Sequence, residues 1–408
     1  MDDTAPQAAI DRLVASAAYR TMAGTLRREH ERTVDDIVAL TQIPSPPFGE
    51  APRAAAYRAM LEAHGLQDVE TDPEGNVFGR RPGAGNGEVV VLAAHLDTVF
   101  PAGIDVTVRR EGTRLHAPGV GDDTRSLAVL LAWLRAMDAA ALRTSADLVI
   151  LGDVGEEGPG DLRGVRRFFA ESRYRDRVKA FITVDGPDMD TLVTGGIASR
   201  RYRATFRGPG GHSLMNFGIV NPMHAMAQTV LELARVAVPA TPRTTHAATI
   251  VSGGTSVNAI PGAVALEVDL RSESMTELAR LDRRFQAIVA EAVAAENHAR
   301  STASGAVEVE LAVIGDRPGG RIDPEADLVR LALAAMRAHG FNPALVTSST
   351  DANIPLSLGI PAIRVGSGGR GDRYHSLEEW IDVEPEESLR GMTAGLVAAL
   401  AVAGVAGG

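Results

Sequence analysis

Histidine and carboxylate residues stand at the ends of apolar segments, where they could bind a metal ion. His95 and Asp97 follow the apolar run Val89–Ala94. They are two positions apart, so their side chains leave an extended chain on the same side. A neutral imidazole beside a carboxylate suits a divalent metal, with the acid as a second ligand or as a support for the histidine. A buried histidine in an ordinary ion pair is the alternative.

Four further segments carry the same residue types. Asp122 follows glycines and precedes a helix in APGVGDD, where a helix cap is the alternative. Glu156 and Glu157 follow an apolar strand, and consecutive residues of an extended chain point apart. One of them could therefore bind metal while the other faces a bound water. Asp185 ends the apolar strand of AFITVDG, and His375 lies in a Gly-rich loop after another strand.

A metal centre explains these positions together. Because the chain has no cysteine, its metal ligands must be His, Asp or Glu. Two imidazoles and three carboxylates are what a pair of zinc ions bridged by one carboxylate requires. The three negative charges and a bound hydroxide would balance two divalent cations. The residues that supply these groups are His95, Asp122, Glu157, Asp185 and His375.

Composition restricts the class of protein. A chain of 408 residues exceeds the usual size of one core, so we expect two domains. The net charge of -11 and the aromatic content of 4% argue against nucleic-acid or anionic-membrane binding. The start, MDDTAPQ, lacks the basic and apolar regions of a signal peptide, and no apolar stretch reaches the length of a membrane span, so we expect a cytoplasmic protein.

Strands alternate with helices around the candidate ligands. This alternation predicts the α/β class, with a mostly parallel sheet between layers of helices. We expect helices at Ile10–Thr33, Val34–Gln42, Ala51–His64, Leu127–Ala141, Leu162–Glu171 and Glu325–His339, and strands at Val89–Ala94, Asp147–Val154 and Lys179–Val184.

The pattern changes between residues 200 and 315. Strand RYRATFRG, a helix at Pro222–Val236, strands TTHAATIVSGG and AVALEVDLRS, a helix at Met275–Arg300 and strand VEVELAVIG follow in turn. This is the split βαβ order of a ferredoxin-like α+β domain. We therefore predict a catalytic domain of residues 1–199 and 316–408, with a lid or dimerisation domain of residues 200–315 inserted into it.

Ordered motifs give the chain a family resemblance. HLDTVFP, GVGDD, GEEG, TVDG, RGPGGHS, SVNAIPG, DLRS, TDAN and YHSLEEW appear in this sequence in that order. As a set they resemble the motifs of co-catalytic zinc metallopeptidases, the family of aminoacylase, peptidase T, carboxypeptidase G and succinyl-diaminopimelate desuccinylase. The likeness covers nearly all of the chain from about residue 34.

The resemblance implies a role for each candidate ligand. His95 and Asp185 would bind one zinc, Glu157 and His375 would bind the other, and Asp122 would bridge them. The peptide bond that follows Asp122 would be cis, as it is in the family.

The resemblance also implies catalytic and substrate-binding residues. Asp97 would tune the first histidine ligand, and Glu156 would be the general base. His212 would reach the partner subunit's active site and polarise the scissile carbonyl, which implies a homodimer through the lid. Asn258 and Arg271 would hold the substrate carboxylate. A local hydrogen bond in a hairpin is the alternative for His212, and a surface ion pair is the alternative for Arg271.

The expected activity is hydrolysis of an amide bond in a small substrate with a free carboxylate. A di- or tripeptide exopeptidase is favoured, and an N-acyl amino acid deacylase of the aminoacylase type is the alternative. A catalytically silent peptide-binding relative should lack a ligand or the base, and none is missing. Asp rather than Glu at position 185 is closer to the peptidase T and carboxypeptidase G branches. Thr124 replaces the usual lysine, which leaves the substrate subclass open, and no role is assigned to the segment before residue 34.

Overall fold

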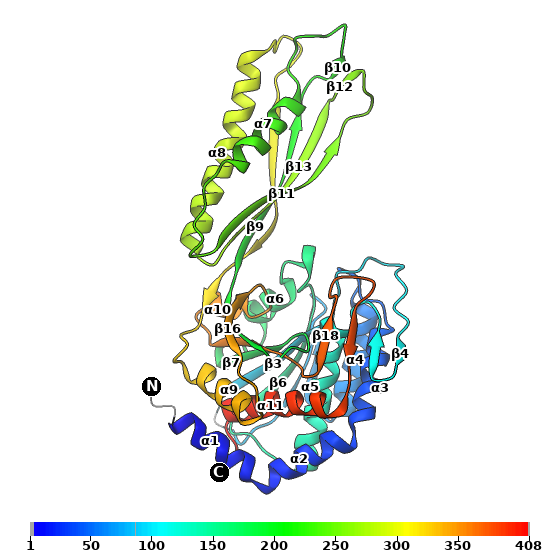
Figure 1. The fold of residues 1–408 in the computed structure, drawn as a ribbon, viewed down its shortest axis with the longest axis vertical. Coiled ribbons are helices and arrows are strands. Elements are labelled where there is room, and N and C mark those ends of the chain that lie inside the picture. Colours follow the sequence, from blue (N-terminus) through cyan, green and yellow to red (C-terminus); the bar gives the residue numbers. More distant parts are fainter. Residues whose placement is uncertain (1–3, 86, 407–408) are drawn as a thin grey trace. The chain divides into compact units, whose positions relative to one another are not determined.

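The chain divides into two compact units, described here in a computed structural model that covers residues 4–85 and 87–406 (Figure 1). The first unit contains the residues up to Gly196 and those from Arg321 onward, and the second contains Ile197–Gly320. The boundaries expected from the sequence, 200 and 315, lie just inside the second unit. That the second unit acts as a lid or as a dimerisation domain remains a prediction.

The first unit is built on a nine-stranded sheet. Its central strands, β6, β3, β7 and β17, run parallel to one another, and β1 and β2 extend it with antiparallel pairing. The expected α/β fold with a mostly parallel sheet is confirmed. In spatial order the strands are β1 (Gln67–Thr71), β2 (Val77–Arg81), β6 (Asp147–Asp153), β3 (Val89–His95), β7 (Val178–Val184), β17 (Ala362–Val365), β8 (Thr191–Gly196) and β15 (Gly320–Arg321), with β16 (Ala344–Ser348) beside β8.

Helices cover both faces of this sheet, which is why β3 is apolar up to its last residue, His95. Val90, Leu92 and Ala94 face one buried core, while Val89, Val91 and Ala93 face another. The first core is closed by α1 (Thr4–Ala15), α2 (Ala17–Arg28), α4 (Ala51–Ala63), α5 (Arg125–Ala139), α9 (Asp327–Ala338) and α11 (Pro385–Ala403), and the second by α6 (Arg163–Glu171) and α10 (Asn353–Ser357). Within the described residues, no helix has both the length and the apolar character needed to cross a membrane.

The N-terminal segment forms three helices rather than the two expected. Ser16 interrupts the first, and its hydroxyl accepts a hydrogen bond from the backbone N–H of Tyr19 at 3.0 Å, so that it caps α2. The third helix, α3, spans His30–Thr41. Met22 and Leu26 of α2 are buried in the first core, so this segment completes the core of the unit.

A small antiparallel sheet, not predicted from the sequence, carries the loop with His375. Each of its strands has only three residues, too few for a periodic pattern to show. Its order is β18 (Arg370–Asp372), β19 (Trp380–Asp382), β5 (Arg114–His116) and β4 (Arg109–Glu111). The loop lies between β18 and β19, while β5 leads into the segment with Asp122, so both segments start from one sheet.

The second unit is an antiparallel sheet with two helices on one face (Figure 1). The expected strand and helix order is confirmed. The sheet order is β11 (Thr244–Gly253), β13 (Ala263–Ser272), β9 (Ala198–Arg207) and β14 (Glu308–Arg317), and the helices are α7 (Pro222–Ala234) and α8 (Met275–Ala299). Two short antiparallel strands, β10 (Gly211–His212) and β12 (Ala259–Ile260), pair with each other, and β10 carries His212.

Candidate metal centre

Neighbouring parallel strands bring three of the candidate segments together. His95 is the last residue of β3, which lies between β6 and β7 and runs parallel to both. Glu156 and Glu157 follow the end of β6, and Asp185 follows β7 directly. The carboxyl ends of these strands meet at one edge of the sheet, where open α/β sheets place their ligands.

Asp122 lies between the two candidate histidine ligands. Its Oδ1 is 2.9 Å from Nε2 of His95, and its Oδ2 is 3.1 Å from Nε2 of His375. The expected cis peptide bond after Asp122 is present. A carboxylate with one oxygen toward each imidazole has the arrangement that a bridging ligand needs.

Thr124, which replaces the family lysine, supports the segment that carries Asp122. Its hydroxyl is buried, donates to the carbonyl of Gly119 at 2.7 Å, and is 2.7 Å from the hydroxyl of Thr41 in α3. The side chain at this position therefore forms hydrogen bonds inside the protein.

Three overlapping groups of side chains could each hold a metal ion. Within each group the ligand atoms lie within 4.8 Å of one another. The groups are Asp122, Glu157 and His375; His95, Asp123 and Asp185; and His95, Glu156 and Glu157. All five ligands expected from the sequence take part. Asp123 was missed, although it forms the visible doublet with Asp122.

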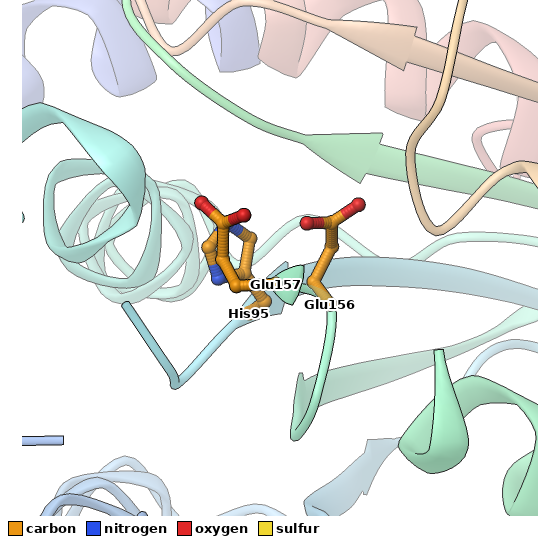
Figure 2. A group of neighbouring side chains, drawn as sticks. All are labelled: His95, Glu156 and Glu157. Carbon is orange, nitrogen blue, oxygen red and sulfur yellow. The ribbon is translucent and has the colours of Figure 1, made fainter. Parts of the chain in front are cut away.

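The two glutamates lie on the same side of their loop. Figure 2 shows the carboxylates of Glu156 and Glu157 side by side, next to the ring of His95. The expectation that they point apart is wrong, because the chain is not a regular strand here: Gly155 has a φ of 74°. Nε2 of His375 is 2.7 Å from Oε1 of Glu157.

Asp97 holds this loop in place. Its buried carboxylate accepts backbone hydrogen bonds from Gly155 at 2.8 Å, Glu156 at 3.1 Å and Glu157 at 2.8 Å. One of its oxygens is also 3.7 Å from Nδ1 of His95. The residue thus supports the glutamate loop in addition to the histidine named by the sequence analysis.

The tautomer of His95 suits a ligand. Its Nδ1 is 3.0 Å from the carbonyl oxygen of Asp97, which can only accept a hydrogen bond. In the neutral ring Nδ1 therefore carries the proton, and Nε2 keeps its lone pair for a metal. Asp123 fixes the neighbouring backbone, because its carboxylate accepts from the N–H of His95 at 3.2 Å and of Gly186 at 3.3 Å.

The electrostatics of the cluster favour bound positive charge. Burial raises the pKa of Glu157 and of Asp185, against the opposing effects of His375 and Arg364. Hydrogen bonds to Asp122 and Glu157 raise the pKa of His375 to about 10. Burial lowers the pKa of His95, but the neighbouring carboxylates outweigh it and leave that pKa raised. Without a cation the site thus retains protons, which a metal would displace.

The donor chemistry fits divalent metal ions. Imidazole nitrogens and carboxylate oxygens are ligands of zinc, and mixed sites of this kind also accept manganese or cobalt. Four of the five ligands are buried or half-buried, and His375 is more exposed. The residues present therefore match a pair of cations bridged by Asp122.

The expected substrate-binding residues belong to the second unit. Nδ1 of His212 accepts backbone hydrogen bonds from Leu214 at 3.2 Å and Met215 at 3.4 Å, so its neutral ring carries the proton on Nε2. Asn258 lies beside it, since its carbonyl oxygen accepts from the N–H of Ser213 at 2.9 Å. The local hydrogen bonds named as the alternative for His212 are thus present, and they leave Nε2 available as a donor.

Arg271 lies on β13 and contacts an acid. Its Nε donates to Oδ2 of Asp269 at 2.6 Å, and its side chain is 40% exposed. This is the ion pair named as the alternative. This ion pair uses Nε and not the two terminal amino groups that a substrate carboxylate would need.

Comparison with known proteins decides the family. The profile of peptidase family M20/M25/M40 matches residues 91–402. The chain belongs to this family. It is therefore a metallohydrolase, and the resemblance inferred from the ordered motifs is confirmed.

Relatives and solved structures include both peptidases and deacylases. The succinyl-diaminopimelate desuccinylase of Delftia acidovorans is 25% identical over 339 residues, which cover 77% of this chain and 83% of the relative. The aminopeptidase PepT of Bacillus cereus has a TM-score of 0.72 at 21% identity, covering 92% of this chain and 98% of that one. The YXEP protein of Bacillus subtilis, a dinuclear metal-binding peptidase of the M20 family, has a TM-score of 0.65 at 17% identity, covering 91% and 97%. At these identities the structures establish the fold, and dinuclear metal binding is typical of the family.

Proposed function

We propose that this protein hydrolyses the amide bond of a di- or tripeptide with a free carboxylate, as an exopeptidase that depends on two divalent cations. The observation that carries the proposal is the position of Asp122, with its two oxygens toward two different histidines. Such a carboxylate can hold two cations next to each other. Zinc is the metal we expect, and we expect the enzyme to act in the cytoplasm.

Each metal position has its own ligands in this proposal. His95 and Asp185 hold one cation, while Glu157 and His375 hold the other. Asp122 belongs to both. Bound there, the cations would polarise a carbonyl group and acidify a water molecule.

Glu156 is the proposed general base. Its carboxylate lies beside that of Glu157 and within 4.8 Å of a ligand nitrogen of His95, so it borders the metal positions. It accepts a proton from the attacking water as the new C–O bond forms. It then gives this proton to the leaving nitrogen as the C–N bond breaks. Asp97 keeps Glu156 in place through the backbone.

His212, Asn258 and Arg271 are the proposed substrate contacts. The Nε2–H group of His212 is a suitable donor for the scissile carbonyl oxygen, where negative charge develops. Asn258 and the terminal amino groups of Arg271 would bind the substrate carboxylate. His212 acts in the active site of the partner subunit in this scheme.

The second unit has an edge suited to a homodimer. Strand β11 is the edge of its sheet, and all of its residues from Ala247 to Gly253 are exposed. Ile250 and Val251 on this strand are 53% and 60% exposed. An open apolar edge pairs readily with another strand, and a second copy related by a two-fold axis offers the same edge.

Deacylation of an N-acyl amino acid is the second candidate. The curated relatives that match this chain are succinyl-diaminopimelate desuccinylases, which supports it. Both candidate reactions hydrolyse an amide bond next to a free carboxylate, so the same site residues serve both.

Activity profiling with metal replacement tests the proposal. The purified protein is stripped with a chelator, reloaded with zinc, cobalt or manganese, and assayed on dipeptides, tripeptides, and N-acetyl and N-succinyl amino acids. We expect about two metal ions per chain and the highest kcat/KM on a di- or tripeptide. A preference for N-acyl amino acids would select the deacylase instead. Less than one metal ion per chain and no hydrolysis would support the silent relative.

A further inference from the structure

Glu379 is a buried carboxylate that the sequence analysis did not single out. It is 1% exposed and lies four residues after His375. Its Oε2 accepts from the backbone N–H of Gly119 at 2.9 Å, and its Oε1 accepts from Gly121 at 2.8 Å and from Asp122 at 3.1 Å. The carboxylate therefore binds the backbone of the segment that carries Asp122.

We propose that Glu379 is a positioning residue that fixes Asp122 and His375 relative to each other, so that these two ligands form one preorganised part of the metal centre. The inference rests on the proposed metal centre and adds to it a residue that binds neither metal nor substrate. Asp122 and His375 are 253 positions apart in the sequence. The carboxylate of Glu379 connects their segments through its three backbone hydrogen bonds.

Backbone contacts strengthen the connection. The N–H of Ala117 donates to the carbonyl of Glu379 at 3.2 Å, and the N–H of Glu379 donates to the carbonyl of Ser376 at 3.2 Å. The first bond extends the pairing of β5 with β19, and the second keeps the His375 loop compact. Glu379 thus sits where the small sheet, the loop and the Asp122 segment meet.

Side-chain packing leaves this junction little freedom. A Cβ atom added at Gly121 would lie 2.8 Å from Ile381 and 3.0 Å from Tyr374. Both of these residues belong to the same segment as Glu379. The backbone before Asp122 therefore packs directly against the segment that carries His375.

The three N–H groups require a carboxylate. Each oxygen of Glu379 can accept more than one hydrogen bond, whereas a glutamine would offer one acceptor oxygen and turn an NH₂ group toward a backbone N–H. Glu379→Gln therefore keeps the size of the side chain while it removes at least one of these bonds. Glu378→Gln is the matched control, because Glu378 is adjacent and exposed and pairs with Arg373 on the surface.

Zinc titration of the full-length protein tests the inference, with a chromophoric chelator as competitor. We expect Glu379→Gln to bind one of its two zinc equivalents about 10 to 100 times more weakly than the wild type. Mutation of a residue that supports a metal ligand commonly lowers metal affinity by this factor. The kcat of this variant on the best substrate should fall about as much, with KM nearly unchanged, and excess zinc should restore part of the activity. Glu378→Gln should match the wild type in each measurement.

A purely structural role predicts a different result. Glu379→Gln would then lower the Tm of the metal-free protein while its folded fraction bound two zinc equivalents with wild-type affinity and turned over at wild-type kcat. That outcome would overturn the inference. If Glu379→Gln does not fold, Glu379→Asp replaces it, because aspartate keeps the charge on a shorter side chain. The same measurements of zinc affinity, kcat and Tm then distinguish the two roles. A wild-type protein that binds less than one zinc would instead refute the proposed metal centre itself.

Discussion

The carboxylate of Asp97 accepts a hydrogen bond from the backbone N–H of Glu157, 60 positions later in the sequence, at 2.8 Å. With its bonds to Gly155 and Glu156, this contact lets one buried side chain determine where both glutamates lie. The glutamate loop is thus anchored to the strand that ends in His95.

Asp97→Asn should therefore disturb the loop. The asparagine NH₂ group cannot accept a hydrogen bond, so at least one backbone N–H of the loop loses its partner. We expect activity or metal affinity to fall about 10 to 100-fold, measured by steady-state kinetics and zinc titration. Asp105→Asn, at an exposed position a few residues later, is the control. Wild-type activity and affinity in Asp97→Asn would refute the role of this residue.

Glu156→Gln should separate metal binding from turnover. The amide cannot accept the proton of water, so we expect kcat to fall about 10² to 10⁴-fold, in the range of general-base catalysis. Both metal ions should remain bound, as measured by elemental analysis. Glu157→Gln should instead weaken metal binding. Glu156 is not the base if its glutamine variant retains wild-type kcat.

His212→Ala should lower kcat about 10² to 10³-fold without loss of metal, as expected for removal of a donor to the developing oxyanion.

Mixing the His212→Ala variant with the Glu156→Gln variant tests the action of His212 across subunits. In a heterodimer, one active site would combine an intact Glu156 with an intact His212 of the partner, so random mixing should restore about a quarter of wild-type activity. No recovery, in heterodimers verified by two different tags, would show that His212 acts within its own chain.

The stability of the protein should decrease on the acid side partly through His339. Burial lowers the pKa of this residue below its ordinary value, and its Nε2 is 3.1 Å from the hydroxyl of Tyr19 in α2. The folded state favours the neutral ring, so this contribution is complete above about pH 6.5 and is lost as the pH falls below it.

His339→Gln should reduce the loss of Tm between about pH 7.5 and 5, measured by thermal unfolding. His30 and His64, whose pKa values burial also lowers, remain in the variant, so part of the loss should persist. The exposed His298, replaced by glutamine, is the control. An unchanged dependence of Tm on pH in His339→Gln would contradict the assignment.

The sheet and the ligands were predictable because they follow from local patterns. In a strand buried on both faces, such as Val89–His95, every residue before the last is apolar, so the histidine at its end is visible in the sequence. The parallel order of such strands brings His95 and Asp185 to one edge. The residue types of the other segments indicated Asp122, Glu157 and His375, and the family resemblance implied the cis bond after Asp122.

The missed features depend on contacts between distant segments. Glu379 is one of two adjacent glutamates, and only the fold shows that its carboxylate meets Gly119, 260 positions earlier. The strands of the small sheet are too short for a periodic pattern. The break at Ser16 was missed because the residues on either side of it continue a helical pattern.

The chain enters the second unit after β8 and returns through β15, and these two strands are neighbours in the sheet of the first unit. Since the departure and the return lie side by side, a short connection could close the same gap. The 124 residues between Ile197 and Gly320 are thus a module whose length and surface can change during evolution while the sheet that carries the ligands stays intact. Because the proposed substrate contacts lie in this module, substrate preference could diversify there without a change in the metal centre.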